Sequence, residues 1–338
     1  MRELKFLQAC PSDIYYTWQV HLWLESLRNI GQSDKAISVI FTPKGRENIT
    51  KWKQVQDLYP EAEFHFYNDT DNLNQFLGIY IPILRPYVLE KHFRLFPELK
   101  EKAIFYCDSD ILFMKDFNIY KFLEDDICYL SDTNSYINSD YFDSKVNQVL
   151  SEKLEEYKTR DVLNEITTLV GINREIAVTN KNHSGGAQYL LKNIDADFWK
   201  KVMTDCITIR TYLQKINGEF FKDENTGYQS WCADMFAVLW NLWYRNQETK
   251  VIPELEFAWA TEPITSLDNK TIFHNAGISN TEMNGYSCFY KGKYHQGSDP
   301  TKDPHLDVIL NDEKSKQYCT WYYANALNDI KQKYNLNY

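Results

Sequence analysis

Residues 103–113 read Ala-Ile-Phe-Tyr-Cys-Asp-Ser-Asp-Ile-Leu-Phe, an apolar run that carries two carboxylates one residue apart. The run has neither Gly nor Pro and contains β-branched and aromatic residues, which predicts a buried strand of a mostly parallel sheet. In an extended chain, Asp108 and Asp110 would point to one face and Ser109 to the other. Two like charges on one face repel unless a hard divalent cation such as Mn²⁺ or Mg²⁺ lies between them. The pattern alone equally allows two solvated aspartates in a turn.

Alternating strand and helix patterns precede this stretch. Strands are predicted at residues 4–9, 36–41 and 62–67, and helices at 14–30, 47–58 and 88–96. This order predicts a doubly wound α/β fold with a mostly parallel sheet, helices on both faces and a binding crevice at the carboxyl ends of the strands. The loops at 11–16 and 108–110 fall at that edge. The chain has no Gly-rich phosphate loop, so a bound diphosphate would need a metal or Lys and Arg for neutralisation.

Composition limits the classes of partner. The chain has 338 residues, a net charge of −10 and no block of Lys or Arg, which argues against nucleic acid or an anionic membrane as partner. No apolar run approaches the roughly 20 residues of a membrane helix, and the N-terminus does not resemble a signal peptide. The seven cysteines are scattered without a C-x-x-C pair, which favours a reducing compartment. We therefore expect a cytoplasmic protein without a transmembrane segment.

The second notable stretch, residues 180–188, reads Asn-Lys-Asn-His-Ser-Gly-Gly-Ala-Gln and leads into apolar residues. Gly185 and Gly186 form the one adjacent glycine pair of the sequence. Such a pair before a strand allows a ligand to approach the backbone closely, or makes a bulge or turn. Taken alone, the pair slightly favours the turn.

Two later residues are candidates for a site. One face of the helix predicted at 227–244 carries the apolar residues Trp231, Met235, Val238 and Leu242. Asp234 falls on the same face, where a carboxylate is unfavourable unless it has a partner, so it is either a structural anchor or a site residue. His274 ends a late strand, and a histidine there is more often a structural residue than a metal ligand.

Taken together, these motifs resemble a glycosyltransferase of the GT-A fold over most of the chain. The strand with Asp108 and Asp110 is similar to the D-x-D strand in which both aspartates hold a divalent metal on a nucleotide-sugar diphosphate. In the retaining family 8 of glycogenin and bacterial galactosyltransferases, an Asn-Ser/Ala-Gly segment follows, and residues 182–186 are similar to it with one extra residue. Residues 274–277, His-Asn-Ala-Gly, match the H-x-x-G of that family. The resemblance implies a Rossmann-like GT-A fold and a site in which Asp108, Asp110 and His274 hold Mn²⁺ or Mg²⁺.

The donor side shows one further likeness and one departure. Residues 84–87, Leu-Arg-Pro-Tyr, also resemble plant hydroxyproline arabinosyltransferases, which implies a donor role for Arg85. Family 8 places a Lys three residues after the Gly of H-x-x-G, for the diphosphate, where this chain has Asn280. Lys291 or Lys293 would replace that lysine, unless the metal alone grips the phosphate.

The nucleotide loop departs from the family pattern as well. Its usual aspartate is not at the end of the first strand, and Asp13 with Tyr15 or Tyr16 would serve the base instead. The residues implied to bind the donor or its nucleotide are Pro11, Asp13, Tyr15, Arg85, Asp108, Ser109, Asp132, Ser184, Gly185, Gly186, Gly277 and Lys291.

The resemblance implies a metal-dependent transfer of a hexose or pentose from a nucleotide-sugar, with UDP the commonest donor nucleotide, to a glycan or other hydroxyl acceptor. Retention of the anomeric configuration follows from the analogy with family 8. Gly185 and Gly186 would let the donor sugar lie against the backbone. Gln188 or Asp132 would hold its hydroxyls, and Asp234 would orient the acceptor hydroxyl or act as a base. The implied catalytic residues are Asp234 and Gln188.

We expect one GT-A-type catalytic domain over residues 1–338. Its parts would be a nucleotide-binding half at about 1–132, a helical insertion at about 140–172, an acceptor and metal-completing half at about 180–300, and a C-terminal docking helix at about 315–338. Three other functions compete with this reading. They are a phosphatase with an aspartate nucleophile, a non-catalytic sugar- or nucleotide-binding module of the same fold, and a scaffold that would leave the carboxylate pair unexplained.

Overall fold

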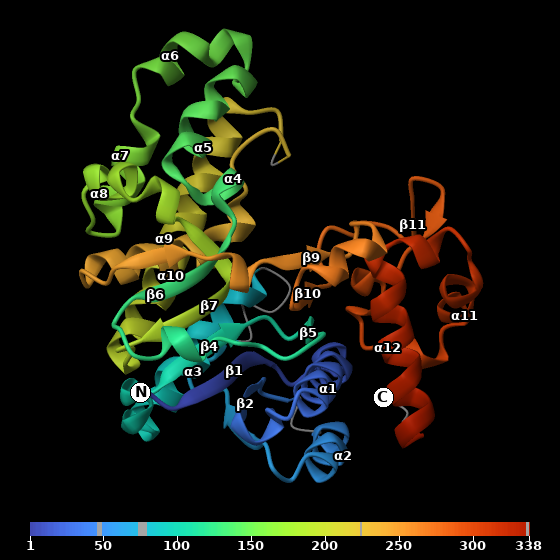
Figure 1. Ribbon diagram of the computed structural model, residues 1–338. Helices are drawn as coiled ribbons and strands as arrows, with labels where there is room; N and C mark the ends of the chain where they lie inside the picture. Colours follow the sequence, from blue (N-terminus) through green and yellow to red (C-terminus); the bar gives the residue numbers. More distant parts are fainter. Residues whose placement is uncertain (46–48, 74–79, 224, 336–337) are drawn as a thin grey trace. The chain divides into compact units, whose positions relative to one another are not determined.

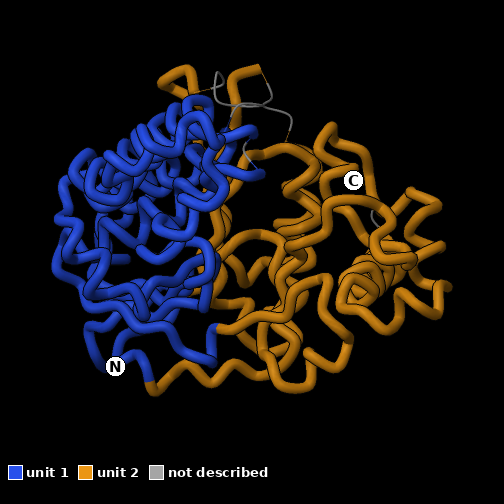
Figure 2. The backbone as a smooth tube through the Cα atoms, turned by 90° about the horizontal axis from the view of Figure 1, so that it is seen from above, with its two compact units in different colours: residues 1–4, 75–106, 122–255 blue, residues 5–74, 107–121, 256–338 orange. Residues whose placement is uncertain are grey.

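The computed structural model describes residues 1–45, 49–73, 80–223, 225–335 and 338 (Figure 1). The chain forms two compact units, which Figure 2 shows in different colours. Unit 1 comprises residues 1–4, 75–106 and 122–255, and unit 2 comprises residues 5–74, 107–121 and 256–338. Each unit is therefore assembled from segments that are far apart in the sequence.

The main sheet is mostly parallel and surrounded by helices. In sheet order its seven strands are β3 (Glu63–Asn68), β2 (Ala36–Thr42), β1 (Leu4–Pro11), β4 (Ala103–Cys107), β7 (Gly185–Lys192), β6 (Cys128–Asp132) and β8 (Thr249–Val251). β1 pairs in parallel with β2, and β2 with β3. β6 pairs in parallel with β8 and antiparallel with β7. This sheet confirms the predicted α/β class and is consistent with a GT-A-like fold.

In unit 2, two helices connect the first three strands. α1 (Ile14–Asn29) follows β1, and α2 (Thr50–Leu58) follows β2, in the β-α-β order predicted from the sequence. β1 and β2 are almost entirely buried, as expected of strands covered on both faces. Glu47, the predicted start of the second helix, lies outside the described residues.

The stretch at residues 103–113 is two strands rather than one continuous strand, and the loop predicted at residues 108–110 separates them. β4 belongs to the main sheet, whereas β5 (Ile111–Phe113) belongs to a second sheet of three strands. Residues 108–110 lie between them, with Ser109 and Asp110 in a turn. The two aspartates therefore do not share a face through the alternation of an extended chain, and their proximity has another cause.

The second sheet brings distant residues of unit 2 together. β10 (Ile272–His274) pairs antiparallel with β5 and parallel with β9 (Phe257–Trp259). The register places His274 opposite Ile111. The remaining elements of unit 2 are the hairpin of β11 (Glu282–Met283) and β12 (Tyr286–Ser287), followed by α11 (Pro304–Asn311) and α12 (Cys319–Tyr334).

The last helix, α12, docks on α1 through both apolar and polar contacts. Leu327 and Ile330 are buried. Glu25 of α1 accepts hydrogen bonds from Lys333 Nζ at 2.5 Å and from the Tyr334 hydroxyl at 2.7 Å. The end of the described chain is thus fixed to the first helix of the same unit.

Unit 1 contains the remaining helices. They are α3 (Leu84–Leu95), α4 (Asn134–Ile137), α5 (Ser139–Ser144), α6 (Leu154–Lys158), α7 (Val162–Leu169), α8 (Arg174–Thr179), α9 (Ala196–Phe220) and α10 (Ala233–Tyr244). α3 begins four residues earlier than the predicted Val88, because Pro86 is tolerated in a first helical turn. α10 begins later than the predicted Gly227, because a 3₁₀ turn at residues 230–232 precedes it.

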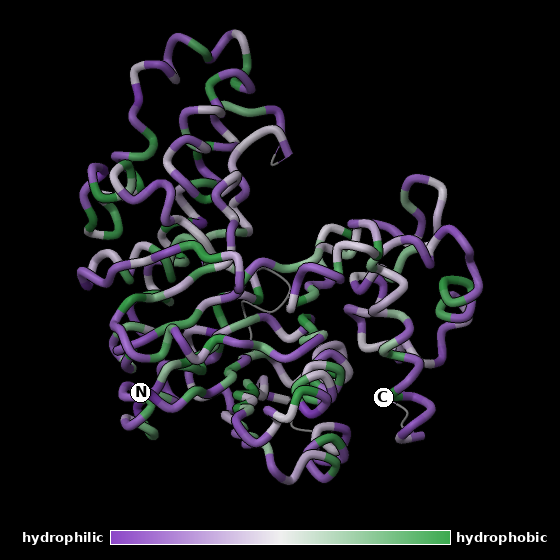
Figure 3. The backbone as a smooth tube through the Cα atoms, viewed as in Figure 1, coloured by the Kyte–Doolittle hydropathy of each residue, from purple (hydrophilic) through white to green (hydrophobic). Residues whose placement is uncertain are grey.

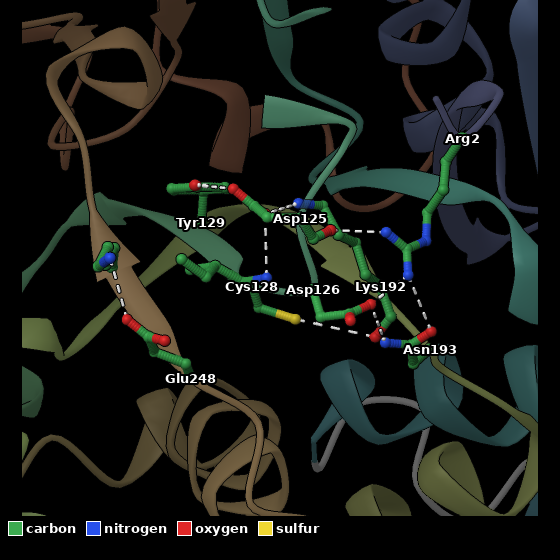
Figure 4. Close-up of polar contacts among 10 residues, drawn as sticks. Arg2, Asp125, Asp126, Cys128, Tyr129, Lys192, Asn193 and Glu248 are labelled. Atoms are coloured by element: carbon green, nitrogen blue, oxygen red, sulfur yellow. Dashed lines mark hydrogen bonds and ion pairs between the residues drawn. The ribbon is translucent and has the colours of Figure 1, made fainter. Parts of the chain in front are cut away.

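A polar network holds the first residues of the chain to unit 1 (Figure 4). Lys192, whose side chain is fully buried, forms an ion pair with Asp125 at 2.5 Å. Arg2 donates a hydrogen bond to the Asp125 carbonyl at 2.6 Å and also pairs with Asp126. Burial lowers the pKa of Lys192, while its contact with Asp125 acts in the opposite direction.

Figure 3 colours the backbone by hydropathy, and hydrophilic residues are spread along its length. Over the described parts of the sequence, no helix combines the length and the apolar character needed to cross a bilayer. All seven cysteines are buried thiols.

Candidate metal centre

Asp108, Asp110 and His274 converge at the turn that links β4 to β5, entirely within unit 2. His274 Nε2 lies 3.6 Å from Asp108 Oδ2 and 3.4 Å from Asp110 Oδ1. The side chain of Asp110 is only 4% exposed and that of His274 7%, whereas that of Asp108 is 29% exposed. Asp110 and His274 are therefore buried, and Asp108 is the member of the triad that is accessible to solvent.

Backbone pairing, rather than strand alternation, assembles this triad. His274 is the last residue of β10, and its partner Ile111 directly follows Asp110. The backbone N–H of Asn275 donates to the Asp110 carbonyl at 3.1 Å. The Ser109 hydroxyl donates a hydrogen bond to Gln19 Oε1 of α1 at 3.1 Å. Ser109 thus anchors the turn to α1.

Lys291 adds a positive charge to the cluster of Asp108, Asp110 and His274. It begins a 3₁₀ turn at residues 291–294, and its ammonium group contacts the second carboxylate oxygen of Asp110. Lys293, the alternative considered from the sequence, pairs with Asp303 at 2.5 Å instead. Of the two candidates, Lys291 is therefore the one that the fold brings to the aspartate pair.

The charges around Asp110 set its protonation state. Burial favours the neutral acid and raises its pKa, but the charges of Lys291 and His274 outweigh burial and hold the pKa well below the usual range. Burial raises the pKa of the Tyr15 hydroxyl, and the negative charge of Asp110 raises it further. Asp110 is therefore ionised at neutral pH, and Tyr15 remains a neutral phenol.

The donor set fits a hard divalent cation. One ligand atom from each of Asp108, Asp110 and His274 lies within 4.8 Å of the other two. Two ligands of one octahedral ion at about 2.1 Å lie about 3 Å apart, close to the distances observed here. Two carboxylates and one imidazole together can hold a divalent cation. The ammonium group of Lys291 already shows that the site attracts positive charge.

The predicted nucleotide-loop residues lie at the carboxyl end of β1 in unit 2. Pro11 ends β1 and is buried, and Asp13 occupies the position before α1. The adjoining carbonyl of Ser12 accepts a hydrogen bond from Trp52 Nε1 at 2.7 Å, which fixes the loop against α2. The Tyr15 ring packs edge-on against His295, with centroids 4.3 Å apart.

Gly277, three residues after His274, is exposed and has a φ of +85°. A residue with a side chain would be strained at that φ, so the turn requires glycine. The glycine of the H-x-x-G pattern is therefore required by the backbone conformation, because the chain turns sharply after the strand that supplies His274.

In unit 1, the glycine pair is explained by the protein's own packing. A Cβ on Gly185 would lie 2.3 Å from the Ser131 carbonyl oxygen and 2.7 Å from Leu130 Cβ. A Cβ on Gly186 would lie 2.6 Å from the Tyr189 hydroxyl oxygen and 2.8 Å from Met235 Cε. Both glycines are buried residues of β7, beside a shift in register between β7 and β6, which agrees with the bulge that the sequence allowed rather than with a separate turn.

The other unit 1 candidates near β6 and β7 differ in exposure. Ser184 and Gln188 are fully buried. Asp132 is exposed at the end of β6, and its carboxylate accepts hydrogen bonds from the Asn134 backbone and side chain at 2.9 and 3.1 Å. Ala187, beside Gln188, has a φ of +68°, an unusual conformation for a residue with a side chain. Asp132 is thus the accessible one of these three polar residues.

Asp234 and Arg85 form an ion pair in unit 1. Their side chains are 14% and 18% exposed. The Tyr80 hydroxyl also lies 3.3 Å from Asp234 Oδ1. The partner expected for a carboxylate at this position is therefore present, and the pair reaches the surface.

The helical spacing predicted that Trp231 shares one apolar face with Asp234, and this prediction is wrong. The Trp231 side chain is exposed, with a relative accessibility of 58%. The reason is that α10 begins only at Ala233, so Trp231 belongs to the preceding 3₁₀ turn and does not follow α-helical spacing.

Two polar residues of the site region were missed by the sequence analysis. Gln19 accepts the hydrogen bond of Ser109. The one feature that sets Gln19 apart in the sequence is that it is a polar residue in a predicted helix rich in apolar residues. Tyr80 holds Asp234, and no local motif distinguishes it. Both act through contacts that join residues distant in the chain.

Two cavities lie elsewhere. One of about 390 Å³ lies among α5, α6, α7 and α8, and one of about 150 Å³ lies between α1, β5 and α12. None of the predicted site residues lines either cavity.

No family model matches the chain, and no curated protein matches it. Among solved structures, it is similar to an apo bifunctional glycosyltransferase, WbbM, with a TM-score of 0.42 and 9% identity over 93% of this chain and 50% of that one. It is also similar to apo mouse xyloside xylosyltransferase 1, with a TM-score of 0.36 and 10% identity over 83% of this chain and 99% of that one. The chain thus spans about half the length of the first of these proteins. At such TM-scores these likenesses do not bear on activity, which depends on the site residues.

Proposed function

We propose that the protein is a metal-dependent glycosyltransferase that moves a sugar from a nucleotide-sugar to a hydroxyl acceptor. The observation that carries this proposal is the convergence of Asp108, Asp110 and His274 at the end of a central strand, in a mostly parallel α/β sheet. Ligands of open α/β sheets bind outside the carboxyl ends of the strands, where this triad lies. The likeness to family 8 motifs then favours UDP as the nucleotide, Mn²⁺ as the metal and retention as the stereochemical course.

The chemistry requires stabilisation of the departing nucleoside diphosphate. A divalent cation held by Asp108, Asp110 and His274 would supply positive charge to that leaving group. Lys291, whose ammonium group contacts Asp110, would give a second positive charge to the diphosphate. Tyr15 is a neutral hydrogen-bond donor beside this charge cluster, and we assign it to the nucleotide.

Further roles are proposed for unit 1. Asp234 accepts hydrogen bonds from Arg85 and Tyr80, so we propose that it orients the acceptor hydroxyl. Exposed Asp132 is better placed than buried Gln188 to hold the hydroxyls of a sugar. Gly185 lets β7 lie close to β6, beside Asp132.

The test is turnover with a panel of UDP- and GDP-sugars, read as release of the free nucleotide. Wild-type protein with Mn²⁺ should hydrolyse or transfer at least one donor, and Asp110→Asn should lose about 100-fold or more in rate. Asp116→Asn, which changes an exposed aspartate of the same unit, is the matched control and should retain full activity. Equal rates in EDTA and in Mn²⁺ would refute metal dependence. Nucleotide binding without any turnover would support a non-catalytic binding module instead.

A further inference from the structure

Trp231 and Tyr136 form an aromatic pair in unit 1, in which Trp231 is exposed and Tyr136 is half-buried. Their ring centroids are 6.4 Å apart and the planes are inclined by 32°. Trp231 is 58% exposed although its side chain is large and apolar. Neither residue has a role in the transfer chemistry proposed above.

The backbone that carries Trp231 is held firmly. The Tyr80 hydroxyl donates a hydrogen bond to the Trp231 carbonyl at 2.9 Å and accepts one from the Asp234 backbone N–H at 3.1 Å. The same turn is fixed by a hydrogen bond from the Gln229 N–H to the Tyr141 hydroxyl at 2.8 Å. An exposed indole on a fixed backbone loses little conformational entropy when a ligand packs on it.

Polar groups border the aromatic pair. Asp234, three residues after Trp231, forms its ion pair with Arg85, and both side chains are partly exposed. Burial raises the pKa of the Tyr136 hydroxyl, and the charges of Asp132 and Asp234 raise it further. Asp132 stands four residues before Tyr136 and Asp234 three residues after Trp231, and the carboxylates of both can accept hydrogen bonds from hydroxyls.

This combination matches the two-sided chemistry of a pyranose ring. A sugar presents C–H groups on one face, which pack on an aromatic ring, and hydroxyls at its edge, which bind carboxylates and guanidinium groups. We propose that Trp231 and Tyr136 form a binding site for a saccharide, whose hydroxyls bond to Asp234, Arg85 and Asp132. Resting on the proposed function, this inference names the acceptor as a glycan rather than another hydroxyl compound. A protein partner would instead favour a wide apolar patch, and charged groups closely border this one.

The inference is tested by saturation-transfer NMR with methyl glycosides of galactose, glucose, mannose, N-acetylglucosamine and xylose. Wild-type protein should saturate the ring C–H protons of at least one glycoside. Trp231→Ala should weaken that binding by about tenfold, and Trp231→Phe should restore part of it because a stacking face remains. Tyr244→Ala removes an aromatic residue of similar exposure at the far end of α10 and should leave binding unchanged.

Titration of the same samples with UDP and Mn²⁺ separates this inference from the proposed function. Metal-dependent UDP binding without saturation of any glycoside would overturn the saccharide site while the transferase proposal stands. Equal glycoside binding by Trp231→Ala and Tyr244→Ala would overturn it as well. Absence of metal-dependent UDP binding would count against the transferase proposal, and loss of glycoside binding in Trp231→Ala alone would still support the saccharide site.

Discussion

At the turn between β4 and β5, Lys291 and a divalent cation would compete for the same carboxylate. The ammonium group contacts Asp110, so it must move when a metal binds there. Lys291→Ala should therefore bind Mn²⁺ about three- to tenfold more tightly in the absence of nucleotide. Electron paramagnetic resonance of free Mn²⁺ measures this affinity directly. Lys293→Ala, whose lysine pairs with Asp303, is the control and should bind like wild type. Weaker Mn²⁺ binding by Lys291→Ala would contradict the competition.

His21 makes stability depend on pH. Burial lowers its pKa from 6.5 to about 3, with nearby Arg28 and Lys333 acting in the same direction and Glu25 opposing them. The folded pKa is below the unfolded one, so the unfolded state binds more protons between these values, and stability is lost as pH falls from about 6.5 towards 3. The contribution is of the order of 3–5 kcal/mol.

Urea unfolding at pH 7 and pH 5 tests this dependence. The free energy of unfolding should fall between the two pH values in wild type and fall less in His21→Gln. His65→Gln, on β3, is the control and should keep the wild-type dependence. An identical pH dependence in His21→Gln would show that His21 is not the responsible group.

At the scale of elements, the approach of β7 to β6 depends on the absence of a side chain at Gly185. A Cβ there would lie 2.3 Å from a backbone oxygen of β6, which cannot move away cheaply. Gly185→Ala should therefore lower the free energy of unfolding by about 2–4 kcal/mol. Gly218→Ala in α9 is the matched control, since a Cβ there meets nothing within 4 Å, and it should be neutral or slightly stabilising. Thermal unfolding compares the two, and equal melting temperatures would refute the packing argument.

The ion pair with Asp125 neutralises the buried charge of Lys192 in unit 1, so replacing either residue should change the stability of the protein. Asp125→Ala leaves a fully buried ammonium group unpaired and should destabilise the protein by about 2–4 kcal/mol. Lys192→Met removes that charge and should change stability by less than about 1 kcal/mol. The double variant should then be more stable than Asp125→Ala alone in urea unfolding. A double variant less stable than both single variants would contradict this account.

At the scale of the whole molecule, local sequence patterns predicted the elements whose contacts are local. The β-α-β order of β1, α1 and β2 was found within two residues of the predicted bounds. That residues 111–113 join a second sheet was missed because β5 pairs with β10, about 160 residues away, and no local pattern reports that pairing. Trp231 was misplaced because the start of α10 was assigned too early.

The site shows the same division between local motifs and distant contacts. The motifs named Asp108, Asp110 and His274, and the structure brings these three together. It also pairs Asp110 with Lys291, 181 residues away, and Asp234 with Arg85, 149 residues away. The sequence suggested each of these basic residues for the donor side, but it could not reveal their partners, because those contacts depend on the tertiary fold.

The central claim is that Asp108, Asp110 and His274 hold a metal that binds the diphosphate of a nucleotide. Calorimetric titration with UDP, in Mn²⁺ and in EDTA, on wild type and Asp110→Asn tests it most directly. The account predicts UDP binding that requires Mn²⁺ and is lost in Asp110→Asn, while Asp116→Asn binds like wild type. UDP binding of equal affinity with Mn²⁺, with EDTA and in Asp110→Asn would contradict the claim.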